Sequence, residues 1–239
     1  MSGITPRTRG RGKPAVAGTA RWLLRGGIGL AVNAGLLFGS AGTFAWPGAW
    51  AYLALQLLSM LYLIFGVHDA KLFAERSRWH QDARVWDKFL LPFAIAPIPL
   101  ALVIAGLDFG RFHWSPPIGW SFKVLALFAM AFGLGLVLWA MKVNTYFSHM
   151  VRIQRERGHR VVTSGPYRYV RHPGYSGHIV AMLALPILLG SYWVLVAAIP
   201  SIVVIVIRTA LEDRMLQDEL AGYRDYALRT RYRLFPRVW

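Results

Sequence analysis

The sequence predicts an all-α integral membrane protein with about four transmembrane helices followed by a helical hairpin. Hydrophobic residues make up 56% of the 239 residues and charged residues only 16%, a composition shifted toward membrane proteins. Four apolar runs, at about residues 26–46, 49–67, 89–107 and 122–141, each approach the ~20 residues that a helix needs to cross a bilayer. Cysteine is absent, which excludes disulfides and thiolate chemistry.

Six Lys/Arg residues and no apolar periodicity mark the first 25 residues. We therefore expect residues 1–20 to form a disordered basic arm on the membrane surface, and residues 21–141 to hold the N-terminal transmembrane helices. A cleaved signal peptide is the competing interpretation, although the run 26–46 is long for one. In a soluble protein the net charge of +16 would suggest nucleic acid. Because apolar runs accompany it, this charge instead predicts contact with anionic lipid headgroups, and no nucleic-acid partner is expected.

Positive charge alternates between the loops. Segment 69–88 carries five Lys/Arg residues, and segment 142–177 and the tail from residue 208 carry seven each, whereas segment 108–121 has only Arg111. The positive-inside rule then places both termini and the two basic loops in the cytoplasm. We expect loop 69–88 to be interfacial, with most of its charges solvated. Three prolines should kink the third helix: Pro92, Pro97 and Pro99.

The last apolar run, residues 178–207, carries no charged residue. As one helix it would be ~45 Å long, more than the ~30 Å hydrocarbon core, and it would leave the basic tail outside the cell. A hairpin that turns near Gly190 and Ser191 is therefore favoured over a single long helix, although its arms are short for full spans. The turn would add Trp193 to an outer aromatic belt with Trp46, Trp50, Trp114 and Trp120.

After the hairpin, apolar residues recur at the spacing of an amphipathic helix: Leu211, Met215, Leu216, Leu220, Tyr223 and Ala227. Arg208, Glu212 and Asp213 directly follow the apolar run, and ionisable groups at such depth are functional candidates. The alternative is that Arg208 and Glu212 only pair with each other.

A polar loop precedes the hairpin, and prolines 166 and 173 with several glycines give it fixed turns. The hairpin brings Arg171, His172, Tyr175 and Glu212 to one cytoplasmic corner. No serine-hydrolase, zinc-protease, Rossmann or Walker motif is present, and we expect no metal site.

Residues 159–177, HRVVTSGPYRYVRHPGYSG, resemble the isoprenylcysteine carboxyl methyltransferase family of membrane enzymes, in its bacterial branch. The family's pattern is G-x-Y, then R-H-P-x-Y-x-G, a helical hairpin, and R-x-x-x-E-[ED]-x-x-L. The last part matches Arg208, Glu212, Asp213 and Leu216. The resemblance covers about residues 69–239 and implies that residues 142–239 form an S-adenosylmethionine-binding methyltransferase core in an inner-membrane protein.

This resemblance implies transfer of a methyl group from S-adenosylmethionine to a lipophilic acceptor, either an isoprenylcysteine-like carboxylate or a lipid headgroup. It implies that Arg171 and Glu212 form the charged pair nearest the reaction, as catalytic residues. The implied cofactor-binding residues are His159, Val162, Gly165, Tyr167, His172, Pro173, Tyr175 and Glu212. The chemistry agrees, because tyrosine rings attract a sulfonium and a carboxylate can balance its charge. An NADPH-dependent reductase of the sterol reductase type and a non-catalytic membrane protein are the alternatives.

Overall fold

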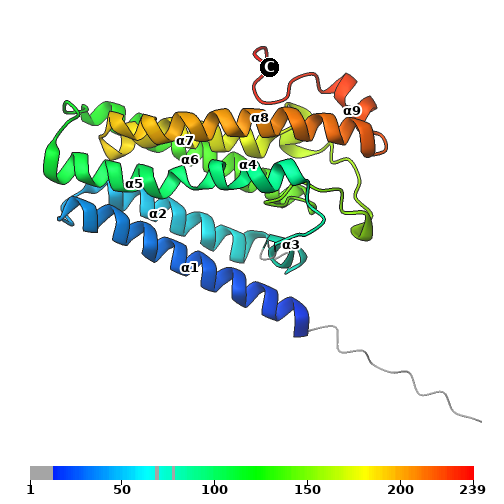
Figure 1. Cartoon of the computed structure of the whole chain (residues 1–239), viewed down its shortest axis with the longest axis horizontal. Helices are drawn as coiled ribbons and strands as arrows, with labels where there is room; N and C mark the ends of the chain where they lie inside the picture. Colours follow the sequence, from blue (N-terminus) through cyan, green and yellow to red (C-terminus); the bar gives the residue numbers. More distant parts are fainter. Residues whose placement is uncertain (1–12, 68–69, 77–78) are drawn as a thin grey trace, which may run out of the picture.

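A computed structural model describes residues 13–67, 70–76 and 79–239, and within these ranges the chain is helical with no strand. The helices are labelled in Figure 1. They are α1 Lys13–Ala41, α2 Pro47–Tyr62, α3 Ala70–Arg76, α4 Val85–Ile95, α5 Pro97–Leu107, α6 Trp120–Val143, α7 Pro173–Leu189, α8 Leu195–Glu219 and α9 Tyr223–Arg229.

Five segments are long and apolar enough to cross a membrane: Trp22–Ala41, Pro47–Val67, Val85–Phe112, Trp120–Val143 and Tyr192–Glu219. Helix α7 is a shorter apolar helix of 17 residues. Four of the five overlap the predicted spans, and the fifth is the second arm of the predicted hairpin. The prediction of an all-α integral membrane protein is confirmed.

The first helix differs from the prediction at both ends. Residues 1–12 of the expected arm lie outside the described residues, while residues 13–20 belong to α1 instead of a disordered arm. Helix α1 ends at Ala41, five residues before the predicted end, because Gly42 takes a left-handed φ of 71°. The connecting residues then lead to Pro47 at the start of α2.

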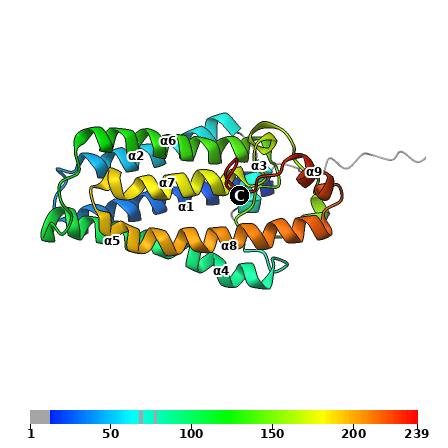
Figure 2. The ribbon, with the colours of Figure 1, turned by 90° about the horizontal axis from the view of Figure 1, so that it is seen from above.

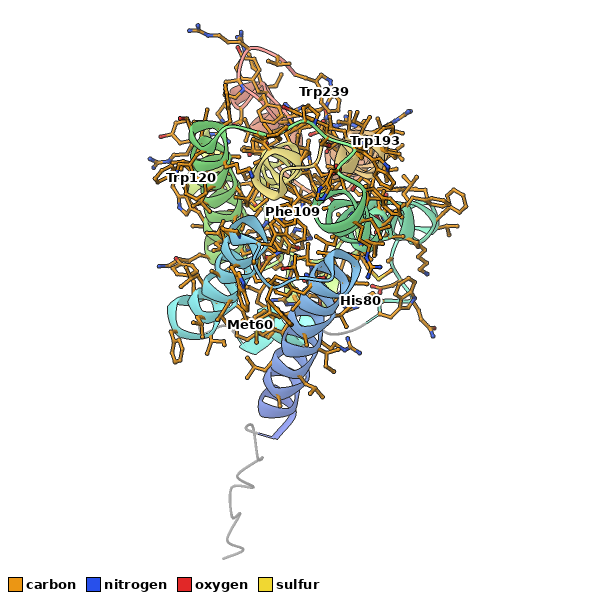
Figure 3. The ribbon with its side chains drawn as sticks, turned by 90° about the vertical axis from the view of Figure 1, so that its left-hand side faces the viewer. Met60, His80, Phe109, Trp120, Trp193 and Trp239 are labelled. Carbon is orange, nitrogen blue, oxygen red and sulfur yellow. The ribbon has the colours of Figure 1, made fainter. Side chains whose placement is uncertain are left out.

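Trp46 was expected in the outer aromatic belt, and this prediction is wrong. Its side chain is fully buried and stacks on Phe109, with ring centroids 4.5 Å apart. Its indole N–H donates to the backbone oxygen of Leu189 (3.1 Å), so it joins the two turns at this end of the bundle. Figure 3, seen from this end, shows Trp120 and Trp193 at the rim and Phe109 between the helices. The other four belt tryptophans are at least half exposed: Trp50, Trp114, Trp120 and Trp193.

The predicted kink in the third span is a break between α4 and α5 at Ala96. Pro97 begins α5, where its missing N–H leaves no hydrogen bond unmade. Helix α4 packs against α8, and α5 packs against both α1 and α8.

The hairpin is present, and its turn lies where it was predicted. Helix α7 ends at Leu189, and the next residue, Gly190, has a φ of 80° that favours a residue without a Cβ. Helix α8 then returns from Leu195. Figure 2 shows α7 between α6 and α8, in agreement with its contacts to both. The expected amphipathic helix is the continuation of α8, which runs unbroken past Arg208 to Glu219. Gly222, which is also left-handed, separates α8 from α9.

Figures 1 and 2 place the start of α1, helix α3, the connection between α6 and α7, and helix α9 at one end of the bundle. The turns α1–α2, α5–α6 and α7–α8 lie at the other end. The basic segments thus share one end, as the charge pattern predicts for a membrane protein.

Helices α6 and α7 approach closely because each has a glycine at their crossing. A Cβ on Gly133 would lie 2.5 Å from the backbone oxygen of Gly177, and one on Gly177 would lie 2.4 Å from that of Gly133. The small residues therefore let the two backbones touch, which is a common way for helices to associate in lipid.

We expect Gly133→Ala to destabilise the protein by about 1–3 kcal/mol, because the added methyl must push α6 and α7 apart. Thermal unfolding in detergent measures the effect. Gly135→Ala, on the same helix, is the control, since a Cβ there meets nothing within 4 Å. Equal stability of the two variants would contradict the close approach.

Candidate functional site

A pocket of about 430 Å³ lies where the connection between α6 and α7 meets α8 and α9. Residues of α3, α4, α5 and α6 complete its wall. One part of the lining is polar and aromatic, and another is apolar: Leu91, Ala94, Ile95, Ile98 and Val137. The pocket is thus shaped for a ligand with both polar and apolar portions.

Most of the predicted site residues line this pocket: His159, Val162, Tyr167, Arg171, His172, Tyr175 and Glu212. Gly165 and Pro173 are not among the lining residues. Gly165 has a φ of 58° and begins a 3₁₀ turn, Gly165–Arg168, that packs against Trp139 and Val143. Pro173 is the first residue of α7. Both residues shape the backbone that presents their neighbours to the pocket.

Asp213 is fully buried on α8 and is the centre of the polar network beneath the pocket. Its carboxylate accepts from the Arg171 guanidinium at 2.7 and 3.0 Å and from Nε of Arg233 at 2.9 Å. Three further neighbours lie at 2.8–3.3 Å: Gln217, Tyr223 and His172. One carboxylate thus connects the loop, α8, α9 and the C-terminal segment.

Arg171 was expected to pair with Glu212, and the structure pairs it with Asp213 instead. Its remaining nitrogen, NH1, donates to the backbone oxygens of Thr230 and Arg231, each at 2.9 Å. Its backbone N–H donates to Tyr232, and that of His172 donates to Arg233. The C-terminal segment is therefore fastened to the R-H-P sequence by both side chain and backbone.

Glu212 faces the pocket and accepts a hydrogen bond from the Tyr175 hydroxyl at 2.7 Å. Among the described residues that line the pocket it is the one acidic side chain, and it has no ion pair. Around it lie the rings of Tyr167, Tyr175 and Tyr223. The pocket thus offers an unneutralised carboxylate among aromatic rings, which suits a cationic group.

One interpretation of the sequence paired Arg208 with Glu212, and the structure shows that they do not pair. The Nε of Arg208 donates to Asp87 at 2.7 Å, and NH2 donates to the backbone oxygen of His149 at 2.9 Å. Asp87 is fully buried and also accepts from the backbone N–H of Val151. The pair therefore ties α4 to α8 and to the loop after α6.

Most of the charges of loop 69–88 were expected to be solvated, but two of its carboxylates are buried in ion pairs. Asp87 is paired with Arg208, and Glu75 is buried against Arg152 at 3.0 Å. Residues 77–78 of this loop, with residue 69, lie outside the described residues. The loop thus builds one wall of the pocket instead of only covering the membrane surface.

His159 accepts a hydrogen bond at Nδ1 from the backbone N–H of Gln154 (3.3 Å), and its ring stacks on Tyr146. Burial first, and then the guanidinium groups of Arg157 and Arg152, lower the pKa of His159 to about 4. The ring is therefore neutral at physiological pH, with its proton on Nε2.

This depressed pKa predicts that the protein loses stability as the pH falls from about 6.5 toward 4. In this range the unfolded chain takes up the proton that folded His159 refuses, so protonation favours unfolding. We expect His159→Gln to reduce the slope of melting temperature against pH. His113→Asn, at an exposed site, is the control. An unchanged slope in His159→Gln would be inconsistent with a neutral, half-buried ring.

Several pocket residues were missed by the sequence reasoning. Asn144 donates to the hydroxyl of Tyr167 at 2.9 Å, and the hydroxyl of Tyr226 donates to the backbone oxygen of Tyr167 at 2.7 Å. Burial raises the pKa of Tyr167, so its hydroxyl remains protonated. Asp213 was already a functional candidate from its place in the R-x-x-x-E-D spacing, but its buried ion pair with Arg171 was not predicted.

Comparison with known proteins gives local matches. A model of the phospholipid methyltransferase family matches residues 122–221. The chain is similar to a protein-S-isoprenylcysteine O-methyltransferase of Schizosaccharomyces pombe, 46% identical over 46 residues, which cover 19% of this chain and 20% of that protein. A probable protein-S-isoprenylcysteine O-methyltransferase of Oryza sativa subsp. japonica is 42% identical over 43 residues, or 18% and 22% of the two chains.

A longer match joins the chain to a protein-S-isoprenylcysteine O-methyltransferase of Dictyostelium discoideum, 26% identical over 114 residues, which cover 46% of this chain and 48% of that protein. The matches therefore span from about a fifth to about half of the length of these relatives. The family match contains the loop, the hairpin and all of α8 described above.

Proposed function

We propose, because this chain is related to the isoprenylcysteine and phospholipid methyltransferases, that it transfers a methyl group from S-adenosylmethionine to a lipophilic acceptor in the membrane. The observation that carries the proposal is Glu212, an unneutralised carboxylate in a pocket of about 430 Å³ lined by tyrosine rings. A pocket of this size accommodates a ligand of about drug size.

The residues present fit the methyl donor. S-adenosylmethionine, when bound, supplies a methyl group on a positively charged sulfur and carries an ammonium group. Glu212 can balance this charge, and the rings of Tyr175 and Tyr223 can make cation–π contacts. His159, Val162, Tyr167 and His172 complete the proposed cofactor-binding set, with Gly165 and Pro173 fixing the turns.

Arg171 is better assigned to positioning than to direct contact with the reacting atoms. All three of its guanidinium nitrogens are bonded to Asp213 or to the backbone of the C-terminal segment. Arg171 thereby joins the loop to α8 at Asp213, the residue next to Glu212. Methyl transfer depends on aligning nucleophile, methyl and sulfur, and such fixed walls supply that alignment.

The apolar wall formed by Leu91, Ala94, Ile95 and Ile98 supports an acceptor that enters from the bilayer. These residues lie on α4 and α5, within a segment apolar enough to span the membrane. A carboxylate acceptor would need no base. An amine would have to lose a proton, and Glu212 would accept it, with the Tyr175 hydroxyl donating to the same carboxylate.

We place the pocket end at the cytoplasmic face, with both termini, in a bacterial inner membrane. Basic residues exposed at this end support contact with anionic lipid headgroups: Arg155, Arg160 and Arg168.

Calorimetry on the purified full chain in uncharged detergent tests the proposal. We expect S-adenosylmethionine to bind and NADPH not to bind. Incubation with a membrane lipid extract and methyl-labelled S-adenosylmethionine should then move label into the lipid or lipidated-protein fraction. Binding of NADPH alone would favour the reductase alternative, and donor binding without any labelled product would favour a non-catalytic protein.

A further inference from the structure

Arg76, the last residue of α3, lies in the pocket wall and has no carboxylate partner among the described residues. Its Nε and NH1 are buried without a hydrogen-bond partner. NH2 meets Nδ1 of His149 at 3.4 Å, and the guanidinium lies over the ring of Phe147, 5.3 Å from its centroid. Burial lowers the pKa of Arg76 to about 10, so the group stays positively charged at neutral pH.

The buried arginines of the pocket are neutralised. Arg152 is paired with Glu75, Arg171 with Asp213, and Arg208 with Asp87. A buried guanidinium without a counter-charge is costly, and buried charges are normally paired. Arg76 therefore stands out as a pocket cation whose Nε and NH1 find no acceptor among the described residues.

His149 lies beside Arg76, and the two side chains together present a set of hydrogen-bond donors. A guanidinium can only donate, so Nδ1 of His149 accepts from Arg76 and the neutral ring carries its proton on Nε2. The nearby Arg76 charge, with burial and Arg208, lowers the pKa of His149, which keeps the ring neutral. Its backbone oxygen is held by Arg208 at 2.9 Å. Both groups therefore offer N–H donors and no acceptor.

The same pocket holds the apolar wall of α4 and α5, with Leu91, Ala94 and Ile95 among its residues. Arg76 lies outside residues 122–221, the part that supplies every residue proposed for the methyl donor except Tyr223. We propose that Arg76, with His149, binds an anionic oxygen group of the methyl acceptor, a carboxylate or a phosphate, while the acceptor's apolar chain lies along α4 and α5. The inference rests on the proposed function and assigns its acceptor class.

The test compares three probes with the same apolar chain: dodecanoate, dodecyl phosphate and dodecanol. Each is titrated into the purified full chain in uncharged detergent. We expect at least one anion to bind about tenfold or more tightly than dodecanol, as a charge-assisted hydrogen bond implies. Arg76→Gln should remove that preference, and Arg76→Lys should retain part of it. The anion that binds more tightly identifies carboxylate or phosphate as the group.

Arg155→Gln is the matched control, because it removes an exposed arginine that does not line the pocket. Thermal unfolding and S-adenosylmethionine affinity are measured for every variant. Equal binding of all three probes by the unmodified chain would overturn the inference. So would an Arg76→Gln variant that keeps its preference for anions, or one that instead loses donor affinity, since the anion would then belong to the donor. A chain that binds the anions through Arg76 but never binds S-adenosylmethionine would refute the proposed function alone.

Discussion

Asp213→Asn is expected to lower the free energy of unfolding by about 3–5 kcal/mol, the usual effect of removing one member of a buried ion pair. The carboxylate is fully buried and is shared by Arg171 and Arg233. An amide would leave both guanidinium groups without a counter-charge. The NH₂ group of the new asparagine would itself be a donor, and it would face the donor group of Gln217 or of Tyr223.

The same change should abolish binding of S-adenosylmethionine, since the loop, α9 and the C-terminal segment all depend on this carboxylate. Thermal unfolding in detergent and calorimetry measure the two effects. Asp218→Asn is the control, because Asp218 lies on the same helix but is exposed and paired only with exposed Arg224. If Asp213→Asn behaves like Asp218→Asn, the network is not what holds the site together.

Glu212→Gln is expected to weaken S-adenosylmethionine binding by about 10- to 100-fold, the loss of one charge-assisted interaction in a partly buried site. Gln has nearly the same shape and can still accept from the Tyr175 hydroxyl, which donates to Glu212 at 2.7 Å. Only the negative charge is removed. The melting temperature without ligand should therefore change little, in contrast to Asp213→Asn.

Calorimetric titration of the donor into Glu212→Gln measures this loss. Glu219→Gln provides the comparison, as it removes a carboxylate of α8 that pairs with Arg84 at the surface and does not line the pocket. Unchanged donor affinity in Glu212→Gln would remove the main support for the site assignment, even if methyl transfer is observed.

The sequence predicts the helices and the hairpin turn well, because these depend on local properties. Apolar runs mark the spans. A glycine at position 190 marks the turn, because glycine readily adopts the left-handed backbone that the structure shows there. The end of α1 was placed wrongly because Trp46 is as apolar as a membrane-facing residue. Its burial depends on Phe109 and Leu189, which are distant in the sequence.

The partners of the charged residues could not be predicted in the same way. Topology brings Arg171, Glu212 and Asp213 to one end of the bundle, but successive residues on a helix point about 100° apart. The rotation of α8 therefore decides that Asp213 meets Arg171 while Glu212 faces the pocket. Arg208 similarly meets Asp87, which precedes it by 121 residues.

By itself, then, the sequence determined that this is a helical membrane protein whose chain turns at Gly190 and carries a methyltransferase-like motif on both sides of that turn. Hydropathy, backbone freedom and motif spacing are properties of short segments, so a single chain reveals them. Only the tertiary structure decided which charges are neutralised. Among the described residues that line the pocket, Glu212 has no ion pair, and Arg76 has two buried guanidinium nitrogens without a hydrogen-bond partner. That outcome depends on the packing of α3, α4 and α8, where the free energy of burying each charge is offset by partners far away in the sequence.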